Sequence, residues 1–135
     1  MVTVSSAWQD IYNAISSNVS DPKSRGTKWI FGSYPDVYAK DFPGFPLIII
    51  HPVDVSEETV DFGISIRKTF ITADVEIFSK SAEELDNLTD SVISACRQIG
   101  TMKHTITISS KSERVDVSGS NVHLRRVVMR WQKYG

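Results

Sequence analysis

Residues 75–90 read VEIFSKSAEELDNLTD, and this stretch contains a change from strand to helix from which the neighbouring elements can be placed. In its first half, and back to about Thr69, apolar residues alternate with polar ones. This is the two-residue period of a strand with one buried face. The pattern predicts a strand over about 69–78 whose apolar side is formed by Ile71, Ala73, Val75 and Ile77.

The second half of the stretch changes to the period of a helix. Ser81 is a residue type that accepts hydrogen bonds from free backbone N–H groups at a helix start, and Glu84 follows at the capping-box spacing. Gly100 stands where a helix stop is expected. We expect an amphipathic helix between them, with an inner stripe of Leu85, Leu88, Val92, Cys96 and Ile99.

A first amphipathic helix is expected near the start of the chain. Ser6 and Gln9 have the capping-box spacing, and the residue before Pro22 is pushed out of the helical region. The apolar stripe of this helix consists of Trp8, Ile11, Tyr12, Ile15 and Val19.

Residues 28–50 contain two short strands and an irregular segment. Residues 28–31 have strand-like composition, and the aliphatic run 47–50 predicts a short strand buried on both faces. Segment 32–46 between them is rich in proline, glycine and aromatic residues. Two interpretations stay open: an ordered loop held out for contact, with Phe45 as a contact residue, or aromatic side chains that cover a sheet edge.

The remaining segments are mostly strand-like. Residues 53–59 are interpreted as an acidic loop, and the alternation at 60–67 predicts a strand. This strand either continues, with a bend, into the strand at 69–78 or joins it by a hairpin near Arg67-Lys68. Three further strands are expected at about 104–109, 114–117 and 122–131. The fold class is therefore α+β: a mostly antiparallel sheet of about five strands with two amphipathic helices packed on one face.

Length and composition limit the possible functions. The 135 residues indicate one domain, and the longest aliphatic run is too short to span a bilayer. One cysteine excludes a disulfide framework and a cysteine-cage metal site. No phosphate loop, nucleophile elbow, zinc motif or calcium loop is present. We expect no enzyme, no cofactor, no metal and no membrane partner; a site assembled from His51, Asp54 and His104 is the enzymatic alternative.

Charge is distributed unevenly along a chain whose formal net charge is −1. Seven basic and two acidic residues follow Met102, whereas the preceding residues include eight basic and fourteen acidic ones. Opposite patches of this kind either join copies of the chain or pair within one domain. The expected contact residues are Arg125, Arg126, Arg130, Trp131, Glu57, Glu58 and Phe45.

The strand at 122–131 is open to three interpretations. Arginine and tryptophan are typical of protein interfaces, but positive charges also protect an edge strand from aggregation. Basic residues beside Trp131 and Tyr134 also fit a nucleic-acid-binding α+β domain, which is the alternative function.

The order of these elements resembles that of the tail-terminator, or tail-completion, proteins of long-tailed phages and related viruses. The resemblance rests on the first helix, the Tyr/Pro-rich segment, FPLIIIHP at 45–52, and the strand-to-helix stretch 75–90. It implies a non-enzymatic structural protein that forms a hexameric ring at the head-proximal end of the tail tube. The implied partners are further copies of the chain, the tail-tube protein and a head-completion or connector protein, with DNA passing through the ring. The implied location is the virion, and the host cytoplasm during assembly.

Overall fold

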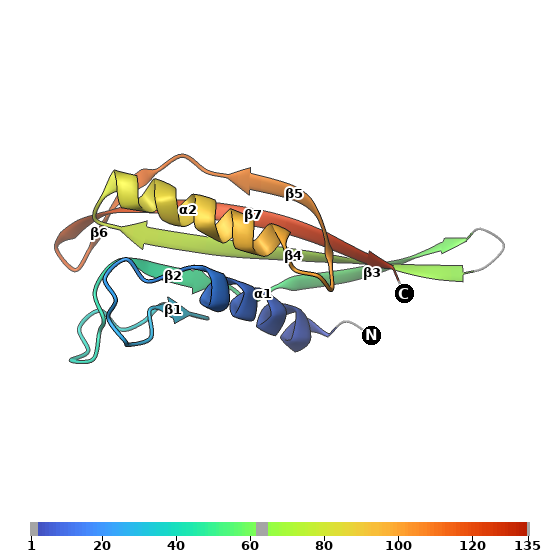
Figure 1. Ribbon diagram of the computed structural model, residues 1–135, viewed down its shortest axis with the longest axis horizontal. Coiled ribbons are helices and arrows are strands. Elements are labelled where there is room, and N and C mark those ends of the chain that lie inside the picture. Colours follow the sequence, from blue (N-terminus) through green and yellow to red (C-terminus); the bar gives the residue numbers. More distant parts are fainter. Residues whose placement is uncertain (1–2, 62–64, 135) are drawn as a thin grey trace.

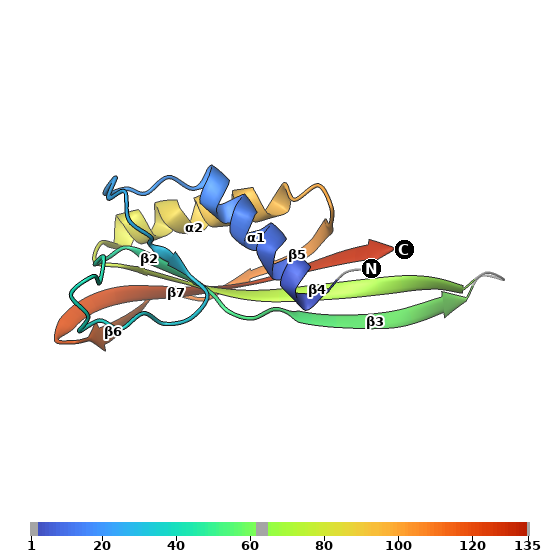
Figure 2. The same ribbon diagram turned by 90° about the horizontal axis from the view of Figure 1, so that it is seen from below.

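The computed structural model describes residues 3–61 and 65–134. Within them, helices α1 (Val4–Asn18) and α2 (Ala82–Arg97) lie on one face of a seven-stranded sheet (Figures 1 and 2). This confirms the α+β class, although the predicted number of about five strands was too low. The strands are β1 (Ile30–Phe31), β2 (Leu47–Ile50), β3 (Asp54–Asp61), β4 (Ser65–Ser79), β5 (Lys103–Ser109), β6 (Glu113–Val117) and β7 (Ser120–Tyr134).

The long strands β4 and β7 form the centre of the sheet. They pair antiparallel from Lys68↔Tyr134 to Ser79↔His123. The strand order is β1-β2-β4-β7-β5, with β3 pairing with β4 and β6 pairing with β7. Only the short β1–β2 pair is parallel among the described strands.

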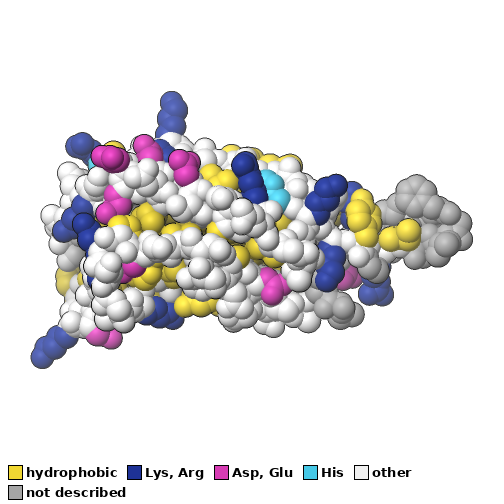
Figure 3. Space-filling model, viewed as in Figure 1, with side chains coloured by type: hydrophobic (Ala, Val, Ile, Leu, Met, Phe, Trp, Pro, Cys, Tyr) yellow, Lys and Arg dark blue, Asp and Glu magenta, His cyan; other side chains and the backbone are white. Residues whose placement is uncertain are grey.

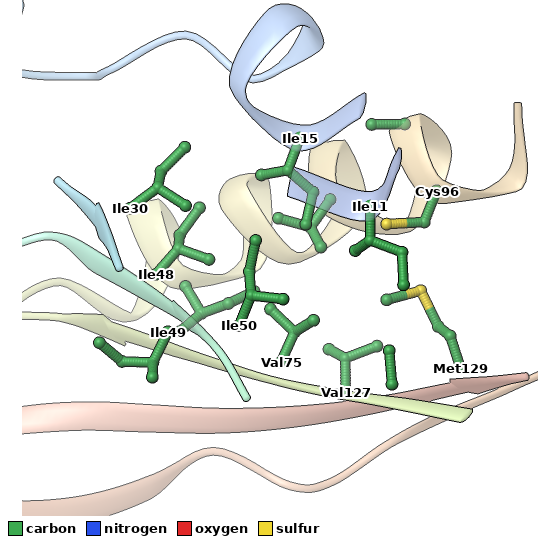
Figure 4. Packing of buried hydrophobic residues seen from close by; sticks show 14 of the residues in the cluster. Ile11, Ile15, Ile30, Ile48, Ile49, Ile50, Val75, Cys96, Val127 and Met129 are labelled. Carbon is green, nitrogen blue, oxygen red and sulfur yellow. The ribbon is translucent and has the colours of Figure 1, made fainter. Parts of the chain in front are cut away.

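The core lies between the helices and the sheet. Ile71, Ala73, Val75 and Ile77 of β4 are fully buried, as their alternation predicts. Figure 4 shows side chains of α1, α2, β2, β4 and β7 meeting in this layer. All four residues of β2 are buried, which confirms the strand predicted at 47–50.

The start of α2 differs in one detail from the predicted capping box. The Ser81 hydroxyl accepts a hydrogen bond from the Glu84 backbone N–H at 3.3 Å, as expected. The Ser81 backbone N–H instead donates to the Ser79 hydroxyl (3.1 Å), which donates to the Glu84 carboxylate (2.7 Å). The buried hydroxyl of Ser79 thus links the end of β4 to the first turn of α2.

Helix α1 begins three residues earlier than predicted. Its capping box is Thr3 with Ser6, not Ser6 with Gln9. Within α1, the indole Nε1 of Trp8 donates a hydrogen bond to the Ile50 carbonyl oxygen at 3.0 Å, which connects α1 to β2. A Cβ atom at Gly32 would lie 3.1 Å from the Trp8 ring, so a glycine allows the chain to pass close to this side chain.

The predicted acidic loop at 53–59 is wrong, because residues 54–61 form β3. Its carboxylates face polar or basic partners across the hairpin: Glu58 is opposite Lys68 and Glu57 is opposite Thr69. β4 runs through Arg67 and Lys68, where a hairpin was considered. The strand predicted at 60–67 is divided between β3 and β4, and its residues 62–64 lie outside the described residues.

Candidate interaction surface

In residues 3–61 and 65–134, two parts of the sheet have no helix packed on them. The outer part of the hairpin of β3 and β4, residues 57–61 and 65–69, projects beyond the helices, and we call it the arm (Figures 1 and 2). The sheet face opposite the helices is called the open face. It is formed by the strand positions that alternate with the core residues, among them Thr72, Asp74 and Glu76 of β4 and Arg126, Val128 and Arg130 of β7.

Basic side chains on the open face have partners within the subunit. Arg126 Nε donates to Asp74 Oδ2 at 2.7 Å, and the hydrogen bond and charge of Asp74 raise the pKa of Arg126. The Arg130 guanidinium carbon lies 4.2 Å from the Phe70 ring centroid, and Lys68 Nζ lies 4.9 Å from it. Cations in contact with an aromatic face are held by the negative charge of that face.

A polar cluster joins three segments at the centre of the open face. The Tyr34 hydroxyl donates to Glu76, and His51 Nε2 contacts the same carboxylate oxygen. The Tyr34 and His51 rings meet edge to face with centroids 5.4 Å apart. Burial and the hydrogen bond to Glu76 raise the pKa of Tyr34 to about 12, because ionising the phenol would place a second negative charge beside the carboxylate.

Beside this cluster lies an apolar hollow of about 320 Å³. Segment 32–46 and β6 form its sides, and Phe45 is part of the wall. The other lining residues are Tyr34, Pro35, Val37, Leu47, Ile49, Glu76, Phe78, Val115, Val117 and Leu124.

Segment 32–46 is held in place by Arg25. Its guanidinium donates to the carbonyl oxygens of Gly44 (3.0 Å) and Pro46 (2.7 Å) and pairs with Asp21 at 2.9 Å. Burial raises the pKa of Asp21, but the hydrogen bonds from Arg25 and the backbone outweigh this and leave the pKa lowered. The segment is therefore an ordered wall of the open face that also presents Tyr38, which is 80% exposed.

Charges of both signs lie along the arm. Glu57, Glu58 and Arg67 are exposed, and the Glu57 carboxylate lies 3.9 Å from Arg67. Figure 3, seen from the helix side, shows Lys and Arg side chains gathered where the arm leaves the body. Because surface ion pairs of this length contribute little to stability, these charges remain available to a partner.

The predicted contact residues lie in different places. Arg126 and Arg130 are on the open face, Phe45 lines the hollow, and Glu57 and Glu58 are on the arm. Arg125 lies on the helix side of the sheet and donates to Asp86 of α2 at 2.7 Å.

Trp131 was predicted to lie on a contact surface, but the structure places it in the core. It is fully buried, and its Nε1 donates to the Cys96 carbonyl oxygen at the end of α2 (3.0 Å). The alternation of β7 places it on the same side as Val127 and Met129, which are also fully buried. Its burial leaves it out of reach of any partner.

Of the titratable groups considered for catalysis, Cys96 is buried, whereas His51 contacts Glu76 on the open face. Burial raises the pKa of the Cys96 thiol to about 12. Burial and the charge of Arg97 lower the pKa of His104, which contacts Thr107 beside the Trp131 ring. In the described part of the chain, no three His, Cys, Asp or Glu residues are grouped as a metal ion would require. No helix there has the length and apolar character needed to cross a membrane.

The cluster of Tyr34, His51 and Glu76 was not predicted as a unit. The polar alternation of β4 placed Glu76 on the solvated side of its strand. Its partners come from segment 32–46 and from the end of β2, 42 and 25 residues away along the chain. No local pattern connects such distant residues, so only the sheet order reveals the cluster.

Comparison with solved structures finds the same fold in a virus-like particle. A chain in a structure described as the virion of a native gene transfer agent particle superimposes with a TM-score of 0.63. The match covers 100% of both chains, with 10% sequence identity. No protein-family model matches this chain, and no curated protein sequence matches it.

Proposed function

We propose that this chain is a structural virion protein that forms a ring at the head-proximal end of a viral tail tube. The ring ends tube polymerisation and joins the tail to the head. The observation that carries the proposal is the likeness to a chain of the gene transfer agent virion over the full length of both chains. The element order that resembles tail-terminator proteins agrees with it.

The arrangement of the surface also supports a function that is performed by binding other protein subunits. A ring subunit needs two different sides that fit each other and two ends that meet different partners. The arm and segment 32–46, which lines the hollow, lie at different ends of the sheet; the positions of the two segments can be followed in Figure 1. Stopping a polymer requires only that a bound subunit present no further site for the next one, so no bond is made or broken.

The proposed partners follow from this position. Six copies of the chain form the ring; the tail-tube protein binds one end and a head-completion or connector protein binds the other. DNA passes through the centre without sequence-specific binding. The protein is then part of the virion and is assembled in the host cytoplasm.

The alternative of a nucleic-acid-binding domain loses its main support. It required a basic strand with an exposed aromatic side chain for base stacking. Tyr134 is 56% exposed and Lys133 beside it is exposed, but Trp131 is buried. Arg125 and Arg126 are each paired with an aspartate of the same subunit, so one aromatic side chain and two of the four basic residues remain from the predicted nucleic-acid surface without such a partner or burial in the core. We therefore do not retain it.

Negative-stain images of the purified protein test the proposal. Annular particles of uniform diameter with a stain-filled centre are expected, together with a single large species in sedimentation velocity. A protein that stays monomeric at high concentration and low salt would contradict the proposal.

A further inference from the structure

The sheet has two edges that are long enough to pair with another chain. Among the described residues, β5 pairs only with β7, and β3 pairs only with β4. β5 has seven residues and β3 has eight. The outer edge of each strand carries backbone N–H and C=O groups with no strand beside them, and such an edge readily pairs with a further strand.

The central part of the β5 edge has little protection against pairing with another strand. It contains no proline, and no residue from 104 to 110 carries a permanent charge. Ile106 and Ile108 are 47% and 61% exposed. A bulge between His104 and Ile106 interrupts the pairing with β7, but β5 pairs regularly again from Ile106 to Ser109. An edge of this kind aggregates unless a partner covers it.

The two edges carry opposite charges. β3 reads DVSEETVD and has four acidic residues and no basic ones. Asp54, Glu57 and Glu58 are exposed. β5 begins at Lys103 and is followed by Lys111, and both lysines are exposed. Opposite charges at two edges favour their pairing and disfavour the pairing of either edge with itself.

We propose that β5 of one copy of this chain pairs edge to edge with β3 of the next copy, so that one continuous sheet runs around the ring. This inference rests on the proposed ring and names the contact that closes it. The contact is heterologous, because each copy uses a different edge on each side. Its repetition closes a ring when the rotation between neighbouring copies divides a full turn into equal steps.

Strand direction agrees with this pairing. β3 and β7 both run antiparallel to β4, and β5 runs antiparallel to β7. β3 and β5 of one copy therefore run in opposite directions. Rotation about a ring axis keeps the direction of each strand relative to that axis, so β5 of one copy meets β3 of its neighbour antiparallel. The alternating directions of the sheet then continue across the subunit boundary.

Charge reversal with rescue tests the pairing. Glu57→Lys with Glu58→Lys is expected to raise the concentration for half-assembly about tenfold or more, and Lys103→Glu with Lys111→Glu to do the same. The four substitutions together are expected to restore assembly. Asp41→Lys with Asp90→Lys, which changes exposed residues away from both edges, is the matched control and should assemble like the wild type. Assembly that is unchanged in both edge variants would overturn the pairing.

Disulfide cross-linking provides a readout that does not depend on charge. Chains with one added cysteine at positions 55–58 are mixed with chains that have one at positions 104–108, and the mixture is oxidised. At least one combination is expected to give a covalent dimer that neither chain gives alone. Wild-type rings whose mixed variants never cross-link would refute the edge pairing and leave the proposed function standing. A wild-type protein that forms no ring would refute both.

Discussion

Replacing leucines of α2 by alanine tests the layer of helices on the sheet. Leu85 is fully buried, whereas Leu88 is 4% exposed and lines an open hollow of about 340 Å³ together with Pro22 and Ser91. Large-to-small core substitutions of leucine cost about 2–5 kcal/mol, and the cost rises with the volume of the cavity that remains. Water and neighbouring side chains fill space more easily at the edge of the open hollow than in the closed core.

We therefore expect Leu85→Ala to lower the free energy of unfolding by about 4–5 kcal/mol and Leu88→Ala by about 2–3 kcal/mol. Urea denaturation followed by circular dichroism and analysed by linear extrapolation gives both values. All variants are compared at one protein concentration, because assembly adds to apparent stability. Asn87→Ala on the exposed side of α2 is the control and should change the value by less than about 0.5 kcal/mol. A cost below about 1 kcal/mol for Leu85→Ala, or a larger cost for Leu88→Ala, would refute the packing described.

Three further predictions concern the titratable groups. Cys96 should resist iodoacetamide in the native protein at pH 8 and react on unfolding, because burial raises its pKa to about 12. Absorbance titration should give a pKa near 12 for Tyr34, and Glu76→Gln should lower this pKa. The pKa of Tyr34 in the folded protein exceeds the unfolded value of about 10. The contribution of the neutral phenol to folding stability is therefore complete below pH 10 and is lost as the pH rises through 12. Arg126→Glu should lower the melting temperature more than Arg126→Ala, since it places a carboxylate beside Asp74, and high salt should reduce the difference.

Each of these predictions has an outcome that contradicts it. Rapid native alkylation at Cys96 would mean that the α2 stripe opens easily. A Tyr34 midpoint that does not respond to Glu76→Gln would mean that burial alone raises its pKa. Equal melting temperatures for the two Arg126 variants at low salt would mean that Asp74 is not its partner in solution.

The elements that could be predicted from the sequence are those whose signals lie within a few neighbouring residues. The cap at Ser81 and the apolar spacing after it predicted α2 because both signals act within a few residues. The alternation in β4 was equally clear, since one of its faces is covered along residues 71–77. In these elements the spacing of the apolar residues along the sequence matches the positions that are buried.

β3 was missed because neither of its faces is covered along most of its length. Its exposed carboxylates gave no apolar alternation, and the strand is held by its pairing with β4. Trp131 was placed wrongly for a related reason. The alternation of β7 divides its side chains into two faces, but it does not say which face the helices cover. Arg125, on the same side as Trp131, made that face look like a contact surface.

The binding of the protein to tail tubes is the most direct test of its proposed role. Tubes assembled from the tail-tube protein of the same virus are incubated with gold-labelled protein and imaged by electron microscopy, and their length is followed after more tube protein is added. We expect label at one end of each tube and no further growth from that end. Label along the tube walls, or growth that continues past a labelled end, would contradict the account.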